Sequence, residues 1–161
     1  MKIKFYAAGG TIDKVYFDAK SEYQVGAPQV EEILKGSNVA FDYEVESVLQ
    51  KDSLEMSDAD RRAIREIVEK DFCDKIVITH GTDTMVETAK FLMGIENKTI
   101  VFTGAMEPAR SRCTDATFNV GCAIAAAQTL PTGVYIAMNG CIYEADKVIK
   151  NYAAKRFEAI S

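Results

Sequence analysis

Histidine and cysteine, the side chains that most often bind metal ions, are scarce in this chain of 161 residues. The four cysteines stand far apart, at positions 73, 113, 122 and 141, and form no CxxC pair. Zinc binding needs clustered ligands, so the sequence predicts structural thiols and neither a metal site nor a cofactor. The only histidine, His80, lies two residues before Thr82 and lacks a nucleophile elbow, which disfavours a Ser-His-Asp arrangement. We expect His80 to have a core or hydrogen-bonding role.

Long apolar stretches and an excess of positive charge are also missing. No apolar run approaches ~18 residues, which disfavours a membrane span. The first apolar run reaches Gly9 and Gly10 too early for a secretory signal, so we expect a cytoplasmic protein. The net charge of −5 disfavours nucleic acid and anionic membranes as general partners. With 48% hydrophobic residues, positions 1–161 are expected to form a single domain with a substantial core.

Short apolar segments alternate with amphipathic ones along the chain. Strands are predicted at residues 3–8, 43–49, 75–79, 99–103 and 133–138. Helices are predicted after Pro28 and over residues 57–72, 84–94 and 114–130, the second of them capped by Ser57. This alternation predicts an α/β fold with three layers, in which helices cover both faces of a mostly parallel, Rossmann- or flavodoxin-like sheet.

Two of the predicted strands end in a glycine followed by a threonine. The first is followed by Gly9-Gly10-Thr11-Ile12, and the third by His80-Gly81-Thr82-Asp83-Thr84. Carboxyl ends of parallel strands are where α/β proteins usually bind ligands, and the threonines suggest hydroxyl chemistry rather than phosphate binding. Taken alone, the first motif could be a tight turn, and the second could merely cap the following helix.

Both segments resemble the bacterial-type L-asparaginase/glutaminase family, whose GGTI and HGTDTM motifs each supply a catalytic threonine. The likeness extends to residues 21–26, 52–58, 104–108 and 134–151, and so covers nearly the whole chain. It implies the fold of the asparaginase N-terminal domain. The usual family members continue with a C-terminal domain that has no counterpart in residues 1–161.

The resemblance also implies roles for individual residues. Thr11 corresponds to the primary nucleophile, and Tyr23 supports proton transfer from a mobile loop that closes over the substrate. Thr82, Asp83 and Lys150 correspond to a second relay on the opposite side of the substrate. Residues 13–27, the longest region without a regular pattern, are therefore expected to form the lid.

The remaining binding contacts implied by the family involve Gly10, Ser53, Leu54, Gly81 and Ala105, in addition to Thr82 and Asp83. Asp83 corresponds to the residue that holds the substrate's α-ammonium, and Ser53 to a donor for its α-carboxylate. The family usually has a polar residue at the position of Leu54, and a leucine side chain cannot make that hydrogen bond.

The missing C-terminal domain is a second departure, because a neighbouring subunit's C-terminal domain helps to bind the α-amino group in two-domain members. Glu107, Glu144 and Glu158 are available as replacements, and nothing in the sequence selects one.

Two functions follow from these residues. The first is an amidohydrolase that converts L-asparagine, or a related side-chain amide, to aspartate and ammonia through a threonine nucleophile. The alternative is a non-catalytic module that binds an amino acid or dicarboxylate in an inherited pocket. Retention of the nucleophile and both relays favours the enzyme. Because a lone domain would leave its site exposed to water, we expect a homo-oligomer, most simply a dimer.

Overall fold

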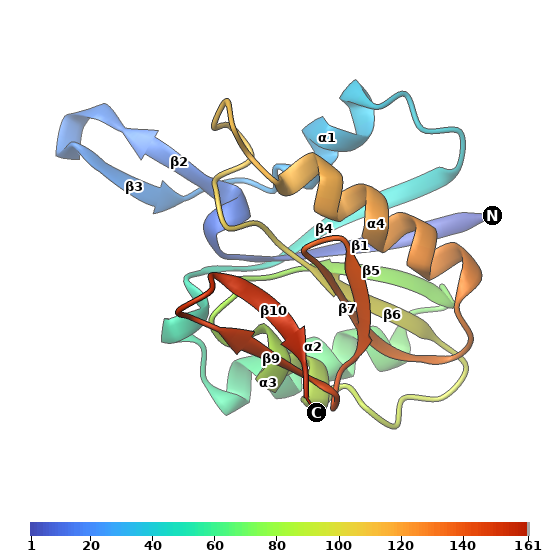
Figure 1. Ribbon diagram of the computed structural model, residues 1–161. Helices are drawn as coiled ribbons and strands as arrows, with labels where there is room; N and C mark the ends of the chain where they lie inside the picture. Colours follow the sequence, from blue (N-terminus) through green and yellow to red (C-terminus); the bar gives the residue numbers. More distant parts are fainter. Residues whose placement is uncertain (161) are drawn as a thin grey trace.

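The computed structural model describes residues 1–160 and places a six-stranded sheet at the centre of the molecule (Figure 1). The strand order is β4-β1-β5-β6-β7-β8. The strands are β1 (Lys2–Gly9), β4 (Asp42–Lys51), β5 (Lys75–Thr79), β6 (Thr99–Thr103), β7 (Gly133–Met138) and β8 (Cys141–Glu144). All neighbouring pairs are parallel except β7 and β8. The five predicted strands are confirmed, and β8 was not predicted.

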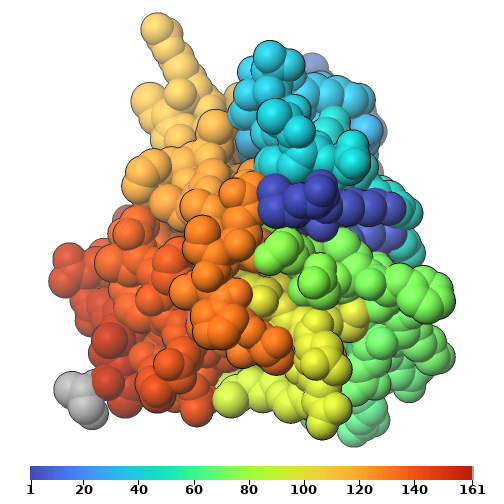
Figure 2. Space-filling model, turned by 90° about the vertical axis from the view of Figure 1, so that its right-hand side faces the viewer, coloured from blue at the N-terminus to red at the C-terminus, as the bar shows by residue number. Residues whose placement is uncertain are grey.

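Helices cover both faces of this sheet, as predicted. α2 (Asp58–Lys70) and α3 (Met85–Phe91) lie on one face, and α1 (Val30–Gly36) and α4 (Ala116–Thr129) lie on the other. Each face has its own apolar cluster, because successive strand residues point to opposite sides of a sheet. The space-filling view shows α4 running down one side of the molecule, between the first residues of the chain and the C-terminal strands (Figure 2).

The helix ends follow from their sequences. Ser57 caps α2 through a capping box, in which its hydroxyl accepts the N–H of Asp60 and the Asp60 carboxylate accepts the N–H of Ser57. Ile64 and Val68 then face the sheet. In α4 a row of alanines is buried against the strands, which allows a close approach, and the helix stops before Pro131. Within residues 1–160 the structure contains no helix with the length and apolar character needed to cross a membrane.

Residues 13–27, expected to lack regular structure, instead form a β-hairpin. Its strands are β2 (Lys14–Phe17) and β3 (Glu22–Val25), joined by a turn that ends with Ser21 in the left-handed region. Tyr16 and Tyr23 are opposite each other, with ring centroids 5.6 Å apart. β-branched and aromatic residues in both strands favour this pairing. The hairpin projects from the body of the molecule (Figure 1).

A second unpredicted hairpin lies near the end of the chain. It consists of β9 (Val148–Asn151) and β10 (Arg156–Ala159), and it packs beside α3. Val148 and Phe157 are fully buried and join the apolar cluster on the α2–α3 face. These two side chains hold the hairpin against the body. Lys150 lies on the same hairpin, in β9.

Candidate active site

The two glycine–threonine turns meet at the carboxyl edge of the sheet, in contact with a third segment. A Cβ atom added to Gly10 would lie 2.3 Å from the Gly81 Cα, and Gly10 has a φ of 87°. A Cβ atom added to Gly81 would lie 2.6 Å from the Ser53 Cβ. Any side chain at either glycine would therefore push these backbones apart. The ends of β1 and β5 and the turn after β4 form a single, closely packed floor.

Lys150 reaches this edge from β9. Its ammonium donates to the Thr82 hydroxyl oxygen at 2.8 Å and to the Asp83 carboxylate at 2.7 Å. The side chain of Lys150 is only 10% exposed, so water screens these contacts weakly. The fold thus brings three of the five predicted catalytic residues into one hydrogen-bonded cluster.

Tyr152 is a member of this cluster that the sequence did not indicate. The Lys150 ammonium lies 4.7 Å from the centroid of the Tyr152 ring, and the Tyr152 hydroxyl donates to the Asp83 carbonyl at 3.3 Å. Tyr152 lies in the turn directly after β9, two residues beyond Lys150, and no periodic pattern in the sequence signalled its position. Asp83, Lys150 and Tyr152 also border a cavity of about 260 Å³ between α3 and β9.

Ser53 and Leu54 have opposite environments. Ser53 is 1% exposed, its hydroxyl oxygen accepts the N–H of Thr84 at 3.3 Å, and its carbonyl accepts the Thr84 hydroxyl at 2.8 Å. Within residues 1–160, the Ser53 hydroxyl oxygen accepts this bond, and its hydrogen is not donated to another group. Leu54 is 71% exposed. The leucine therefore lies at the surface of the turn rather than among the buried groups of the site.

Thr11 and Tyr23 are not part of the Lys150 cluster. Thr11 begins a short 3-10 turn (Thr11–Asp13) and is half-buried. Tyr23 is 59% exposed on the projecting hairpin, where its ring packs edge-on against Tyr16. Ala105 is buried just beyond β6 and packs in the cluster on the α1–α4 face.

Asp13, at the base of the hairpin, is a buried acid that the sequence did not single out. Its carboxylate accepts the N–H of Gln29 at 2.9 Å, and its carbonyl accepts the N–H of Gly26 at 2.8 Å. Asp13 therefore joins the start of the hairpin to the segment that follows it. Burial raises the pKa of the Asp13 carboxyl to about 7, although the hydrogen bond from Gln29 acts in the opposite direction.

Two of the three glutamates considered as replacements for a partner's residue have partners within the chain. Glu144 forms an ion pair with Lys147 at 2.7 Å. Glu158 accepts the side-chain amide of Asn151 at 3.0 Å and pairs with Arg156 at 2.7 Å, and these contacts lower the pKa of its carboxyl. The backbone N–H of Glu107 donates to Asp115, and this bond fixes the loop. The Glu107 carboxylate takes no part in this bond.

The fold and this edge together define a class: an α/β domain whose parallel strands carry two glycine–threonine turns to one edge of the sheet, the edge where such domains usually bind ligands. The family itself is given by comparison with known proteins. Residues 2–161 match the family model described as "Asparaginase, N-terminal", and the chain belongs to this family. The predicted family and fold are confirmed.

Similar proteins include L-asparaginase 2 of Escherichia coli (strain K12), which is 35% identical over 160 residues, 92% of this chain and 46% of the relative. Glutaminase-asparaginase of Acinetobacter glutaminasificans is 34% identical over 129 residues, 76% of this chain and 38% of the relative. The solved structure of the thermostable L-asparaginase from Thermococcus kodakarensis superposes with a TM-score of 0.85 at 26% identity, covering 99% of this chain and 51% of that one. The chain spans about half the length of the relatives it matches, or less.

Proposed function

We propose that this domain hydrolyses L-asparagine or a related side-chain amide to aspartate and ammonia, with Thr11 as the nucleophile. The observation that carries the proposal is the contact of the Lys150 ammonium with both Thr82 and Asp83. A buried lysine held by a hydroxyl and a carboxylate is suited to moving a proton, and a domain that only binds its ligand does not need it.

The chemistry divides between two sides of the substrate. The Thr11 oxygen bonds to the amide carbon, Tyr23 relays the hydroxyl proton, and the C–N bond breaks as the nitrogen leaves as ammonia. Water then cleaves the Thr11 ester, which restores the hydroxyl and releases aspartate. Because the Lys150 ammonium donates to the Thr82 oxygen, the Thr82 hydroxyl hydrogen is directed elsewhere and can reach the substrate or the water.

Binding of the amino-acid portion is assigned to groups on the floor of the site. The Asp83 carboxylate would hold the α-ammonium, and the Ser53 hydroxyl would donate to the α-carboxylate. Gly10 and Gly81 let the backbones approach closely enough to place these groups around one small ligand. Ala105, at the end of the neighbouring strand β6, completes the proposed set.

A second candidate function is a binder for an amino acid or dicarboxylate. The exposure of Tyr23 and Leu54 favours it, because one proton-transfer group lies away from the cluster and one polar contact is missing. Ammonia release from asparagine, glutamine and a panel of β- and γ-amides separates the two functions. Release that disappears in Thr11→Val supports the hydrolase. If calorimetry shows that aspartate binds but no amide releases ammonia, the binding function would replace the hydrolase.

We further propose that the domain forms a homodimer that shields the open edge. On α4, the small residues Ala123, Ala126 and Ala127 pack against the chain's own sheet, so they are not available to this interface. Light scattering at micromolar concentration tests the assembly, and a single species near 17.7 kDa would refute it.

A further inference from the structure

His80 lies beneath the Gly81 turn in a chain of buried hydrogen bonds that joins three elements. Its Nδ1 atom is 2.7 Å from the Gly81 carbonyl oxygen, and its Nε2 atom is 2.8 Å from the Thr88 hydroxyl on α3. The Nε–H of Arg61, from α2, donates to the same hydroxyl at 3.0 Å. All three side chains are buried, and His80 is fully so.

The direction of each hydrogen bond follows from the chemistry of its ends. The Gly81 carbonyl can only accept, so the proton of the neutral imidazole must be on Nδ1. Burial lowers the pKa of His80 to about 4, and the charge of Arg61 acts in the same direction. The ring is therefore neutral near pH 7, and Nε2 must accept from Thr88.

Thr88 connects the imidazole to the arginine. Its hydroxyl gives its hydrogen to Nε2 of His80, and its oxygen accepts from Arg61, which stays protonated in proteins. The other imidazole tautomer would place a lone pair against the Gly81 carbonyl oxygen at 2.7 Å. At this fully buried position, that arrangement would lose a hydrogen bond and add repulsion.

We propose that Arg61 is a positioning residue, which acts through Thr88 and His80 to hold the Gly81–Thr82 peptide in one orientation. The C=O and N–H of a planar trans peptide point in opposite directions, so fixing the Gly81 carbonyl also fixes the Thr82 N–H. The Cα atom of Thr82 is then held in place, and this positions the Thr82 hydroxyl to accept the hydrogen bond from Lys150. The role of this orientation in catalysis rests on the proposed hydrolase, whereas the hydrogen-bond chain itself does not.

The position of Arg61 on α2 supports this role. It occupies the buried line of the helix with Ile64 and Val68, where an apolar residue would otherwise be expected. Its guanidinium also pairs with Asp58 at 3.2 Å. Without Arg61, the Thr88 oxygen would lose a charged donor, and the Thr88 hydroxyl could turn to Met56, whose sulfur lies 3.6 Å away. The Nε2 atom of His80 would then lose its hydrogen bond, and only the Gly81 carbonyl would still hold the ring.

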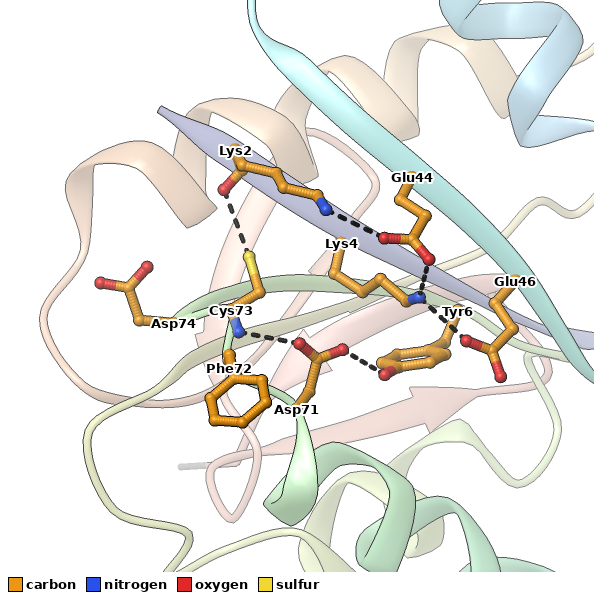
Figure 3. A pocket seen from close by; sticks show the side chains of 9 residues that line it. All are labelled: Lys2, Lys4, Tyr6, Glu44, Glu46, Asp71, Phe72, Cys73 and Asp74. Atoms are coloured by element: carbon orange, nitrogen blue, oxygen red, sulfur yellow. Dashed lines mark hydrogen bonds and ion pairs between the residues drawn. The ribbon is translucent and has the colours of Figure 1, made fainter.

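Lys4 provides a matched control, because it is a buried cation in a different setting. It lies in a hollow of about 590 Å³ beside the amino-terminal half of β1, where its ammonium pairs with Glu44 at 2.8 Å and Glu46 at 2.9 Å (Figure 3). In the same hollow the Tyr6 hydroxyl donates to Asp71. These partners come from β1, β4 and the α2–β5 loop, and none of them contacts His80.

A long-range ¹H–¹⁵N spectrum tests the proposal without reference to activity, since His80 is the only histidine. For the full chain we expect a protonated Nδ1, an unprotonated Nε2, and no titration between about pH 5.5 and 8. Arg61→Met and Thr88→Val should each shift the Nε2 resonance, because this acceptor nitrogen loses the hydroxyl that is directed at it. Lys4→Met should retain the original spectrum. Arg61→Lys, which keeps a charged donor, should also retain it, and Thr88→Val tests the same hydrogen-bond chain if Arg61→Met does not fold.

An Nε2-protonated ring in the unmodified chain would overturn the proposal, and so would an unchanged ring spectrum in folded Arg61→Met and Thr88→Val. If amide hydrolysis is established, Arg61→Met should lower kcat about tenfold with little change in KM, because positioning rather than binding is lost. A normal spectrum with no hydrolysis of any amide would count against the proposed function alone.

Discussion

The two sides of the candidate site differ in how far they are assembled. On one side, Lys150, Thr82 and Asp83 are joined by short hydrogen bonds in a largely buried setting. On the other side, Thr11 lies on a tight turn, and Tyr23 is exposed on a hairpin that extends away from the body. Under the proposed mechanism, one relay is therefore already assembled in the structure, whereas the other requires the hairpin to move.

This difference follows from what anchors each segment. The hairpin that carries Lys150 is anchored by the buried side chains of Val148 and Phe157. The hairpin that carries Tyr23 exposes the rings of Tyr16, Phe17 and Tyr23, and its base is held largely by the hydrogen bonds of Asp13. A preorganised relay stabilises charge without reorganisation, and a mobile segment can exclude water after the substrate has entered.

The largest effect is expected at the nucleophile. Thr11→Val keeps the shape of the side chain and removes the hydroxyl, so ammonia release should fall by roughly 10³-fold or more. Thr11 is only half-buried and lies in a turn, so the thermal midpoint should change little. Thr11→Ser is the control and should retain measurable turnover. Ammonia release near the original rate from well-folded Thr11→Val would assign the nucleophile elsewhere.

The assembled relay is tested at Lys150. Lys150→Met preserves the length of the side chain but removes both hydrogen bonds, and turnover should fall by roughly 10²- to 10³-fold. The hydroxyl of Thr82 and the carboxylate of Asp83 would lose a shared partner, so a loss of stability should accompany the loss of rate. Lys147→Met, a change of an exposed lysine on the same segment, is the control. Equal rates for the two variants would remove Lys150 from the mechanism.

The movable side is tested by limited proteolysis. Lys20 lies at the exposed tip of the Tyr23 hairpin, and Lys155 lies at the exposed tip of the Lys150 hairpin. If the first hairpin closes on a ligand, saturating aspartate should slow tryptic cleavage after Lys20 by about tenfold and leave cleavage after Lys155 unchanged. Equal protection at both tips would indicate general stabilisation, and no protection at Lys20 would make the hairpin a fixed connector.

The sequence predicted the elements that have a clear apolar pattern and missed the shortest strands. Strands β5, β6 and β7 have the predicted bounds, because continuous apolar runs between turn residues leave little choice. The strands of both hairpins have only four residues each, which is too short for a period of two to stand out. Their pairing depends on tertiary contacts, such as the burial of Phe157, that a single sequence does not display.

The candidate site was found largely through the family motifs. Lys150 contacts Thr82 across 68 positions, and no local pattern in the sequence implies that contact. Arg61 and Asp13 were missed for a further reason, because charged residues are normally expected at the surface. Arg61 is buried because Thr88 and Asp58 satisfy it, and Asp13 is buried because it bonds the start of the hairpin to Gln29.

The smallest effect is expected at Asp13 and concerns stability. Its carboxyl has a pKa of about 7 in the fold, raised mainly by burial, against an ordinary value of 3.8. Between these two values the folded chain binds more protons at this site than the unfolded chain does. The stability that Asp13 contributes is therefore fully present below about pH 4 and is lost as the pH rises through 7.

Asp13→Asn removes this titration while keeping an oxygen that can accept the N–H of Gln29. Relative to the variant, the unmodified chain should become less stable by about 1–3 kcal/mol between pH 4.5 and pH 8, as measured by urea unfolding at each pH. Asp18→Asn, a change at an exposed position of the same hairpin, should show no such trend. Parallel pH profiles for the unmodified chain and Asp13→Asn would mean that Asp13 is ionised in the fold at low pH. The hydrogen bond from Gln29 would then offset the effect of burial on the pKa of the Asp13 carboxyl.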